Sequence, residues 1–103
     1  MVDFWRLLGF KTVDPPEPLG GYVTWVERKA TQIHLIHTEA ATVPVLGHTA
    51  VVVEDFEATL ASLAAAGHEV EQTRDLWGAR RAFAIGPGGH RVELMAAPPP
   101  PSR

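Results

Sequence analysis

The chain of 103 residues contains no cysteine, so disulfides are excluded and any bound metal must take histidine, carboxylate or water as its ligands. It has no run of about 18 apolar residues, which argues against a transmembrane helix. The N-terminus also lacks the basic region, apolar stretch and small-residue cleavage site of a secretory signal. We therefore expect a cytoplasmic protein with no membrane partner.

Basic residues are outnumbered, since 9 Lys and Arg stand against 12 Asp and Glu and leave a net charge of −3. Because nucleic-acid binders normally present a basic face, we expect no nucleic-acid partner. The hydrophobic content of 46% and the charged content of 20% are typical of a globular protein. The length suits one core, so we expect a single domain over residues 1–97 and a mobile proline-rich tail over 98–103.

The second half of the sequence, residues 47–96, has the pattern of a strand, a helix and three further strands. GHTAVVV is rich in β-branched residues and typical of a buried strand. The helix EDFEATLASLAAAGH follows, with Asp55 as its expected N-cap and Gly67 as its expected stop. EVEQTR, RRAFAIGP and HRVELM are the three further strands, and GPGG (86–89) predicts a tight turn between the last two.

The first half, residues 1–38, repeats this order without an opening strand. MVDFWRLLGF predicts a helix that ends at Gly9, and KTVD, GYVTWVER and TQIHLIH predict three strands. Gly67 lies 58 residues after Gly9, and Glu93 of RVEL lies 59 residues after His34 of QIHL, so the two matches agree to within one loop residue. PPEPLGG (15–21) predicts a loop, and EAATVPVLG links the halves. The sequence therefore predicts an α+β fold of two βαβββ units, the first incomplete.

Three motifs carry a family resemblance. GH-x-A-V-V-V-x-D on the first strand, L-x-A-A-G after the helix and G-P-x-G-x-x-x-E-L at the last hairpin resemble the vicinal oxygen chelate superfamily. That superfamily includes glyoxalase I, extradiol dioxygenases, fosfomycin-type resistance enzymes and bleomycin-binding proteins. The resemblance covers nearly the whole chain and is strongest over 47–95. It implies that the two units form one cupped mixed sheet, with the helices outside.

The resemblance also implies a metal site, because the superfamily's ligands lie on the first and last strands of each unit. It assigns His34, His48 and Glu93 as ligands and puts a fourth on the absent strand. Such a set suits divalent Fe, Mn, Ni or Zn and leaves positions for the vicinal oxygens of a substrate. Glu93 is then also the expected catalytic residue. A slipped alignment would exchange His34 for His37, which faces the other side of its strand.

Structural alternatives accompany these assignments. His48 at the start of a strand and Glu93 on a strand face are also compatible with purely structural roles. The aromatic residues are expected either to line a pocket for a planar ligand or to pack in the core, and Arg80 and Arg81 either to steer an anionic substrate or to lie in solvent. The expected substrate-binding residues are Trp25, Trp77, Arg80 and Phe83.

The absent strand has two consequences. It leaves a sheet edge open, for which a homodimer is the natural cover. It also leaves the first helix without a preceding Ser, Thr, Asp or Asn cap. Either that helix frays, or the sequence begins too late in its gene and the upstream residues encode a strand with a His, Gln or Glu ligand.

Two functions follow, and the choice between them stays open. The first is a metal-dependent lyase, isomerase or dioxygenase of the glyoxalase type, acting on a small substrate. The second is a metal-free protein that sequesters a planar, bleomycin-type drug. A third reading, a partner protein that pairs through its open edge, ranks last.

Overall fold

The structure is a computed structural model that describes residues 1–17 and 21–101. It contains helices and strands in the predicted order, so the α+β fold class is confirmed. Contacts divide the chain into two compact units, Met1–Thr42 and Val43–Arg103, close to the two predicted repeats. The predicted loop and tail fall partly on residues 18–20 and 102–103, outside the described residues. Neither helix in the described ranges is long and apolar enough to cross a membrane.

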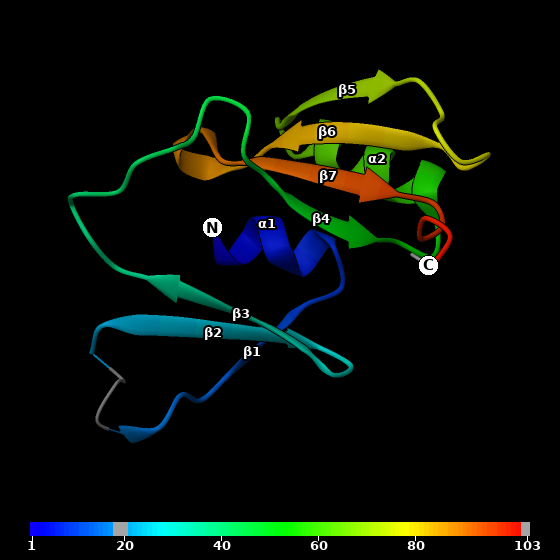
Figure 1. Cartoon of the computed structure of the whole chain (residues 1–103). Coiled ribbons are helices and arrows are strands. Elements are labelled where there is room, and N and C mark those ends of the chain that lie inside the picture. Colours follow the sequence, from blue (N-terminus) through cyan, green and yellow to red (C-terminus); the bar gives the residue numbers. More distant parts are fainter. Residues whose placement is uncertain (18–20, 102–103) are drawn as a thin grey trace. The chain divides into compact units, whose positions relative to one another are not determined.

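The first unit contains one helix and three strands. The strands form an antiparallel sheet in the order β1-β2-β3 (Figure 1). The helix ends just before Gly9, whose φ of +91° favours glycine because it has no Cβ. The elements of the first unit are α1 (Val2–Leu7), β1 (Lys11–Val13), β2 (Val23–Arg28) and β3 (Thr31–Ile36).

Aromatic and aliphatic side chains of this unit supply its buried residues. Phe4, Trp5 and Phe10 are almost fully buried, and the Trp5 ring meets the Phe10 ring edge-on at 5.3 Å between centroids. Arg28 of β2 donates to the Leu8 carbonyl at 3.0 Å, and its guanidinium lies 4.8 Å from the centre of the Phe10 ring. Arg28 therefore ties the end of the helix segment to one face of the sheet, which we call the helix face of this unit.

The second unit has the complete predicted order of strand, helix and three strands. Its sheet has the order β4-β7-β6-β5, in which β4 runs parallel to β7 and the other pairs are antiparallel. The mixed sheet of the prediction is thus found as two hydrogen-bonded sheets, one in each unit. The elements are β4 (Thr49–Val52), α2 (Phe56–Ala65), β5 (Glu69–Thr73), β6 (Arg81–Ile85), the 3-10 turn η2 (Pro87–Gly89) and β7 (Arg91–Met95).

Helix α2 has the caps that its sequence predicts. The Asp55 side chain accepts from the Ala58 N–H at 3.1 Å, and Gly67 follows the helix with φ of +90°, matching Gly9 of the other unit. Figure 1 shows α2 lying across one face of its sheet. The apolar stripe of α2 and the strand residues on that face are buried: Val51, Phe56, Leu60, Leu63, Ala82, Ala84, Val92 and Leu94.

Candidate functional site

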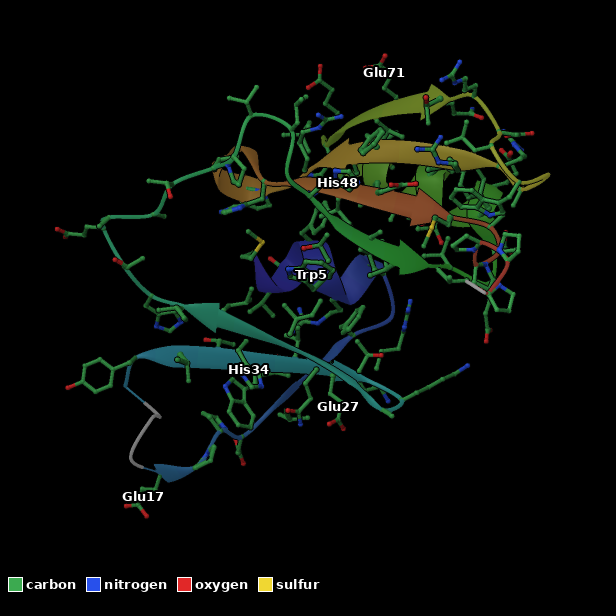
Figure 2. The ribbon with its side chains drawn as sticks, in the orientation of Figure 1. Trp5, Glu17, Glu27, His34, His48 and Glu71 are labelled. Carbon is green, nitrogen blue, oxygen red and sulfur yellow. The ribbon has the colours of Figure 1, made fainter. Side chains whose placement is uncertain are left out.

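The sheet of the second unit has a second face that points away from α2. Side chains alternate along a strand, so residues paired in register lie on the same face. Phe83 of β6 is opposite Glu93 of β7, and Glu93 is opposite Ala50 of β4, so these three residues share a face. In β6 and β7 this face carries the odd-numbered residues, which alternate with the buried even-numbered ones. His48 lies just before β4 on the same side (Figure 2). We call this surface the site face; its chemically active members are His48, Arg81, Phe83, Arg91 and Glu93.

His48 and Glu93 meet at one end of the parallel strand pair. The Nε2 atom of His48 is 2.9 Å from Oε1 of Glu93, and its Nδ1 is 2.9 Å from the Leu46 carbonyl oxygen. A carbonyl oxygen only accepts, so Nδ1 carries a proton and Nε2 is the nitrogen turned toward the carboxylate. An acceptor oxygen therefore faces each ring nitrogen of His48.

Glu93 is buried and is held from its other side by Arg81. Arg81 Nε donates to Oε2 of Glu93 at 2.7 Å, and the two side chains are only 11% and 8% exposed. Burial alone would raise the pKa of Glu93. The hydrogen bonds and charges of Arg81 and His48 outweigh that effect, so the pKa lies below its ordinary value. Glu93 is therefore an ionised carboxylate at neutral pH.

Arg81 also connects Glu93 to the loop between β5 and β6. Its Nη1 donates to the Arg74 carbonyl at 2.9 Å, and its guanidinium lies 5.4 Å from the centre of the Trp77 ring. Trp77 in turn donates from Nε1 to the Ala97 carbonyl at 3.0 Å. The predicted ligand-binding Trp77 thus anchors its loop to the segment that follows β7.

Phe83 contacts both His48 and Arg91. The His48 and Phe83 rings meet at 88° with 5.0 Å between centroids, and the Arg91 guanidinium lies 4.3 Å from the Phe83 centroid. Phe83 therefore belongs to the same cluster as His48 and Glu93. Arg91 was not predicted from the sequence, although the two-residue period of β7 puts it on the side of Glu93.

Arg80 is not brought to this cluster. It forms an ion pair with Glu57 of α2 and hydrogen-bonds Gln72, and its guanidinium lies 5.0 Å from the centre of the Phe56 ring. These partners belong to the helix side of the unit. The neighbouring Arg81, for which we also expected either an anion-steering role or a place in solvent, is the one that reaches Glu93.

Trp25 and His34 lie together in the first unit. Their rings stack with centroids 3.8 Å apart and planes 3° from parallel, and the buried Trp25 Nε1 has no hydrogen-bond partner among the residues that the structure describes. Nε2 of His34 also lies 3.1 Å from the Gln32 side-chain oxygen (Figure 2). The register pairs Trp25 with His34, on the face opposite that of Arg28. His34 thus faces away from the helix face of its unit, as Glu93 does in the second.

His37 has a different environment from His34. Its Nε2 is 2.8 Å from the Thr24 hydroxyl oxygen. Thr24 is two residues from Val26 and four from Arg28, so the alternation of β2 puts it on the helix face of the first unit. His34 in β3 and His37 just after it therefore lie on opposite faces of the sheet.

The predicted metal ligands are brought together in part. Within residues 1–17 and 21–101, no group of three or more His, Asp or Glu side chains is placed to hold a metal ion. His48 and Glu93 form a pair in the second unit, while His34 belongs to the first. A histidine nitrogen and a carboxylate oxygen are both ligands that divalent ions take, so this pair would supply two of the ligands of such an ion.

A comparison with protein-family models finds a match over most of the chain. The family model of the Glyoxalase/Bleomycin resistance protein/Dioxygenase superfamily matches residues 1–94. No curated protein sequence matches the chain significantly.

Solved structures share the fold at low sequence identity. A glyoxalase family protein from Enterococcus faecalis is 23% identical, with a TM-score of 0.67 over 89% of this chain and 82% of that one. The fosfomycin resistance protein FosX from Listeria monocytogenes is 13% identical, with a TM-score of 0.74 over 93% and 78%. A bleomycin resistance determinant encoded on the transposon Tn5 is 14% identical, with a TM-score of 0.65 over 91% and 83%. These likenesses concern the fold.

Proposed function

Because the chain belongs to the Glyoxalase/Bleomycin resistance protein/Dioxygenase superfamily, we propose that it binds a divalent metal ion and a small substrate with vicinal oxygens. The observation that carries the proposal is the 2.9 Å approach of His48 Nε2 to Glu93 Oε1. Because Nδ1 donates to the Leu46 carbonyl, Nε2 is the nitrogen that would bind a metal ion, as in histidines whose other nitrogen has an outer partner. His34 is retained as the predicted third ligand.

The residues around the pair have distinct tasks in this proposal. Arg81 holds Oε2 of Glu93, so that Oε1 remains directed toward His48. Phe83 packs against His48 and provides an apolar wall beside the donors. Glu93 is kept ionised and is the proposed catalytic residue, because an ionised carboxylate accepts a proton. A bound divalent ion would supply polarisation of the substrate oxygens.

A metal-free binding protein is the second candidate, and Arg81 is the observation that favours it. The guanidinium at 2.7 Å already compensates the charge of Glu93, so this carboxylate does not depend on a metal ion for a partner. In this alternative a planar drug packs against an aromatic side chain such as Phe83 or Trp25. The protein then acts by sequestration rather than by catalysis.

Elemental analysis of protein purified without chelators separates the two candidates. We expect a stoichiometric divalent metal in the wild type, its loss in His48→Ala, and its retention in the matched control His90→Ala, which changes the histidine that follows the η2 turn. A metal-free wild type that binds an aromatic drug would establish the second candidate instead. The solution mass of the same sample tests the proposed homodimer.

A further inference from the structure

The charges on the site face do not balance at Arg91. Glu93 is paired with Arg81 and hydrogen-bonded to His48. Arg91, only partly exposed, lies over the Phe83 ring, and within residues 1–17 and 21–101 it has no ion pair. A guanidinium on an aromatic ring keeps its N–H groups free at its rim, where they can donate to an anion.

Two glutamates on the edge strand do not remove this imbalance. Glu69 and Glu71 of β5 share the site face by register, because they are opposite Ile85 and Phe83. Both are exposed, Figure 2 shows Glu71 on β5, and neither is within ion-pair distance of Arg91. Charges in solvent at such separations interact weakly, so an acidic group that enters beside Phe83 would still find a free cation.

We propose that the ligand of this site is an organic acid, and that Arg91 binds its carboxylate or other acidic group. The inference rests on the proposed function, because it takes the vicinal oxygens to lie at His48 and Glu93. Phe83 connects these two groups, because its ring contacts both His48, with 5.0 Å between centroids, and the Arg91 guanidinium, 4.3 Å from its centroid. A ligand ring that packs beside Phe83 would then have its oxygens near His48 and its acidic group near Arg91.

Planar recognition also favours an oxyacid over a single ion. A guanidinium offers parallel N–H donors that match the two oxygens of a carboxylate. Arg91 is held over Phe83 by the cation–π contact, so less side-chain freedom is lost when the acid binds. Arg91 would therefore determine which vicinal-oxygen compounds the site accepts, without contacting the metal ligands.

A matched pair of probes tests the inference. Catechol and 3,4-dihydroxybenzoate both have vicinal oxygens on one ring and differ by a carboxylate. Calorimetric titration of the protein as purified is expected to show roughly ten-fold or tighter binding of 3,4-dihydroxybenzoate, the effect of a charged hydrogen bond. In Arg91→Gln that preference is expected to fall to about one while catechol affinity is unchanged. Arg91→Lys is expected to retain part of it.

The controls separate this inference from the proposed function. Arg74→Gln removes the same charge from an exposed loop position and should leave the preference intact. An Arg91→Gln protein that keeps the preference, or loses catechol and 3,4-dihydroxybenzoate affinity equally, overturns the inference, as does a wild type that binds neither compound. A preference for the acid in a wild type that contains no metal supports the role of Arg91 and overturns the metal-dependent function instead.

Discussion

The imidazole of His48 lies 2.9 Å from the carboxylate of Glu93, although 45 residues separate them in the sequence. Their approach is a consequence of the parallel pairing of β4 with β7, the first and last strands of the second unit. Residues near the start of one strand and in the middle of the other are then neighbours on one face. Any unit of this order brings together the polar side chains that its two end strands carry.

Replacement of Arg81 by Met is expected to lower the free energy of unfolding by about 3 kcal/mol, because it leaves the buried Glu93 carboxylate with His48 alone. Arg81→Lys should lose less, since the charge remains. Urea denaturation at neutral pH measures both. Arg6→Met is the control: its pair with Asp3 is exposed and should change stability by about 0.5 kcal/mol or less. Equal losses in the Arg81→Met and Arg6→Met proteins would contradict the buried ion pair.

Much of this arrangement is predictable from the sequence, and the reason is periodicity. The matching positions of Gly9 and Gly67 reveal the repeat, and both glycines end their helix segments at positive φ. The end-strand positions of His48 and Glu93 then follow from the order of the elements. The pairing of Arg81 with Glu93 is harder to predict, because it depends on the register that the η2 turn sets between β6 and β7.

The sequence does not predict which of two adjacent side chains makes a given contact. Arg80 and Arg81 are adjacent and chemically identical, yet one binds Glu57 and the other Glu93. The two arginines differ in the face of the sheet to which they point: Arg80 toward α2 and Arg81 toward the site face. Trp77 shows the same limit: its indole N–H donates to the Ala97 carbonyl, a contact that no periodic pattern contains.

The stability contribution of Glu93 is expected to depend on pH. Its pKa in the folded protein lies below the ordinary value of 4.5 that it regains on unfolding. The contribution is complete above the ordinary value and is lost as the pH falls through the lower folded value, because the protonated group no longer pairs with Arg81. The difference in unfolding free energy between wild type and Glu93→Gln should therefore shrink with acidification. A difference that stays constant as the pH falls would contradict this dependence.

The two candidate ligands near the end of the first unit make a direct comparison. His34 faces away from the helix face of its unit, as Glu93 does, whereas His37 contacts Thr24 on the opposite face. We expect His34→Ala to lose bound metal on dialysis against a weak chelator and His37→Ala to retain it. Metal analysis of the two dialysed proteins decides the matter. Loss of metal in His37→Ala alone would mean that the alignment of the two repeats is shifted, so that His37 rather than His34 corresponds to Glu93.

The N-cap of α2 allows a test of the fold that is independent of the site. Asp55→Ala removes the acceptor of the Ala58 N–H and should cost about 1 kcal/mol of stability. Asp55→Asn keeps an acceptor oxygen at the cap and should cost only a fraction of that amount. Thermal and urea denaturation should rank the three proteins in this order. An Asn variant as unstable as the Ala variant would show that the negative charge, rather than the cap hydrogen bond, stabilises the helix start.

Trp77 is expected to hold the segment after β7 through its indole N–H. Trp77→Phe keeps a ring near the Arg81 guanidinium but removes the donor to the Ala97 carbonyl, so it should cost about 1 kcal/mol. Hydrogen exchange should then accelerate around Ala96, whose N–H donates to the Arg80 carbonyl, more than around the Asp55 cap. Leu76→Ala changes an exposed neighbour in the same loop and should leave exchange at Ala96 unaltered. If both variants accelerate it equally, the loop as a whole, rather than the indole hydrogen bond, fixes this segment.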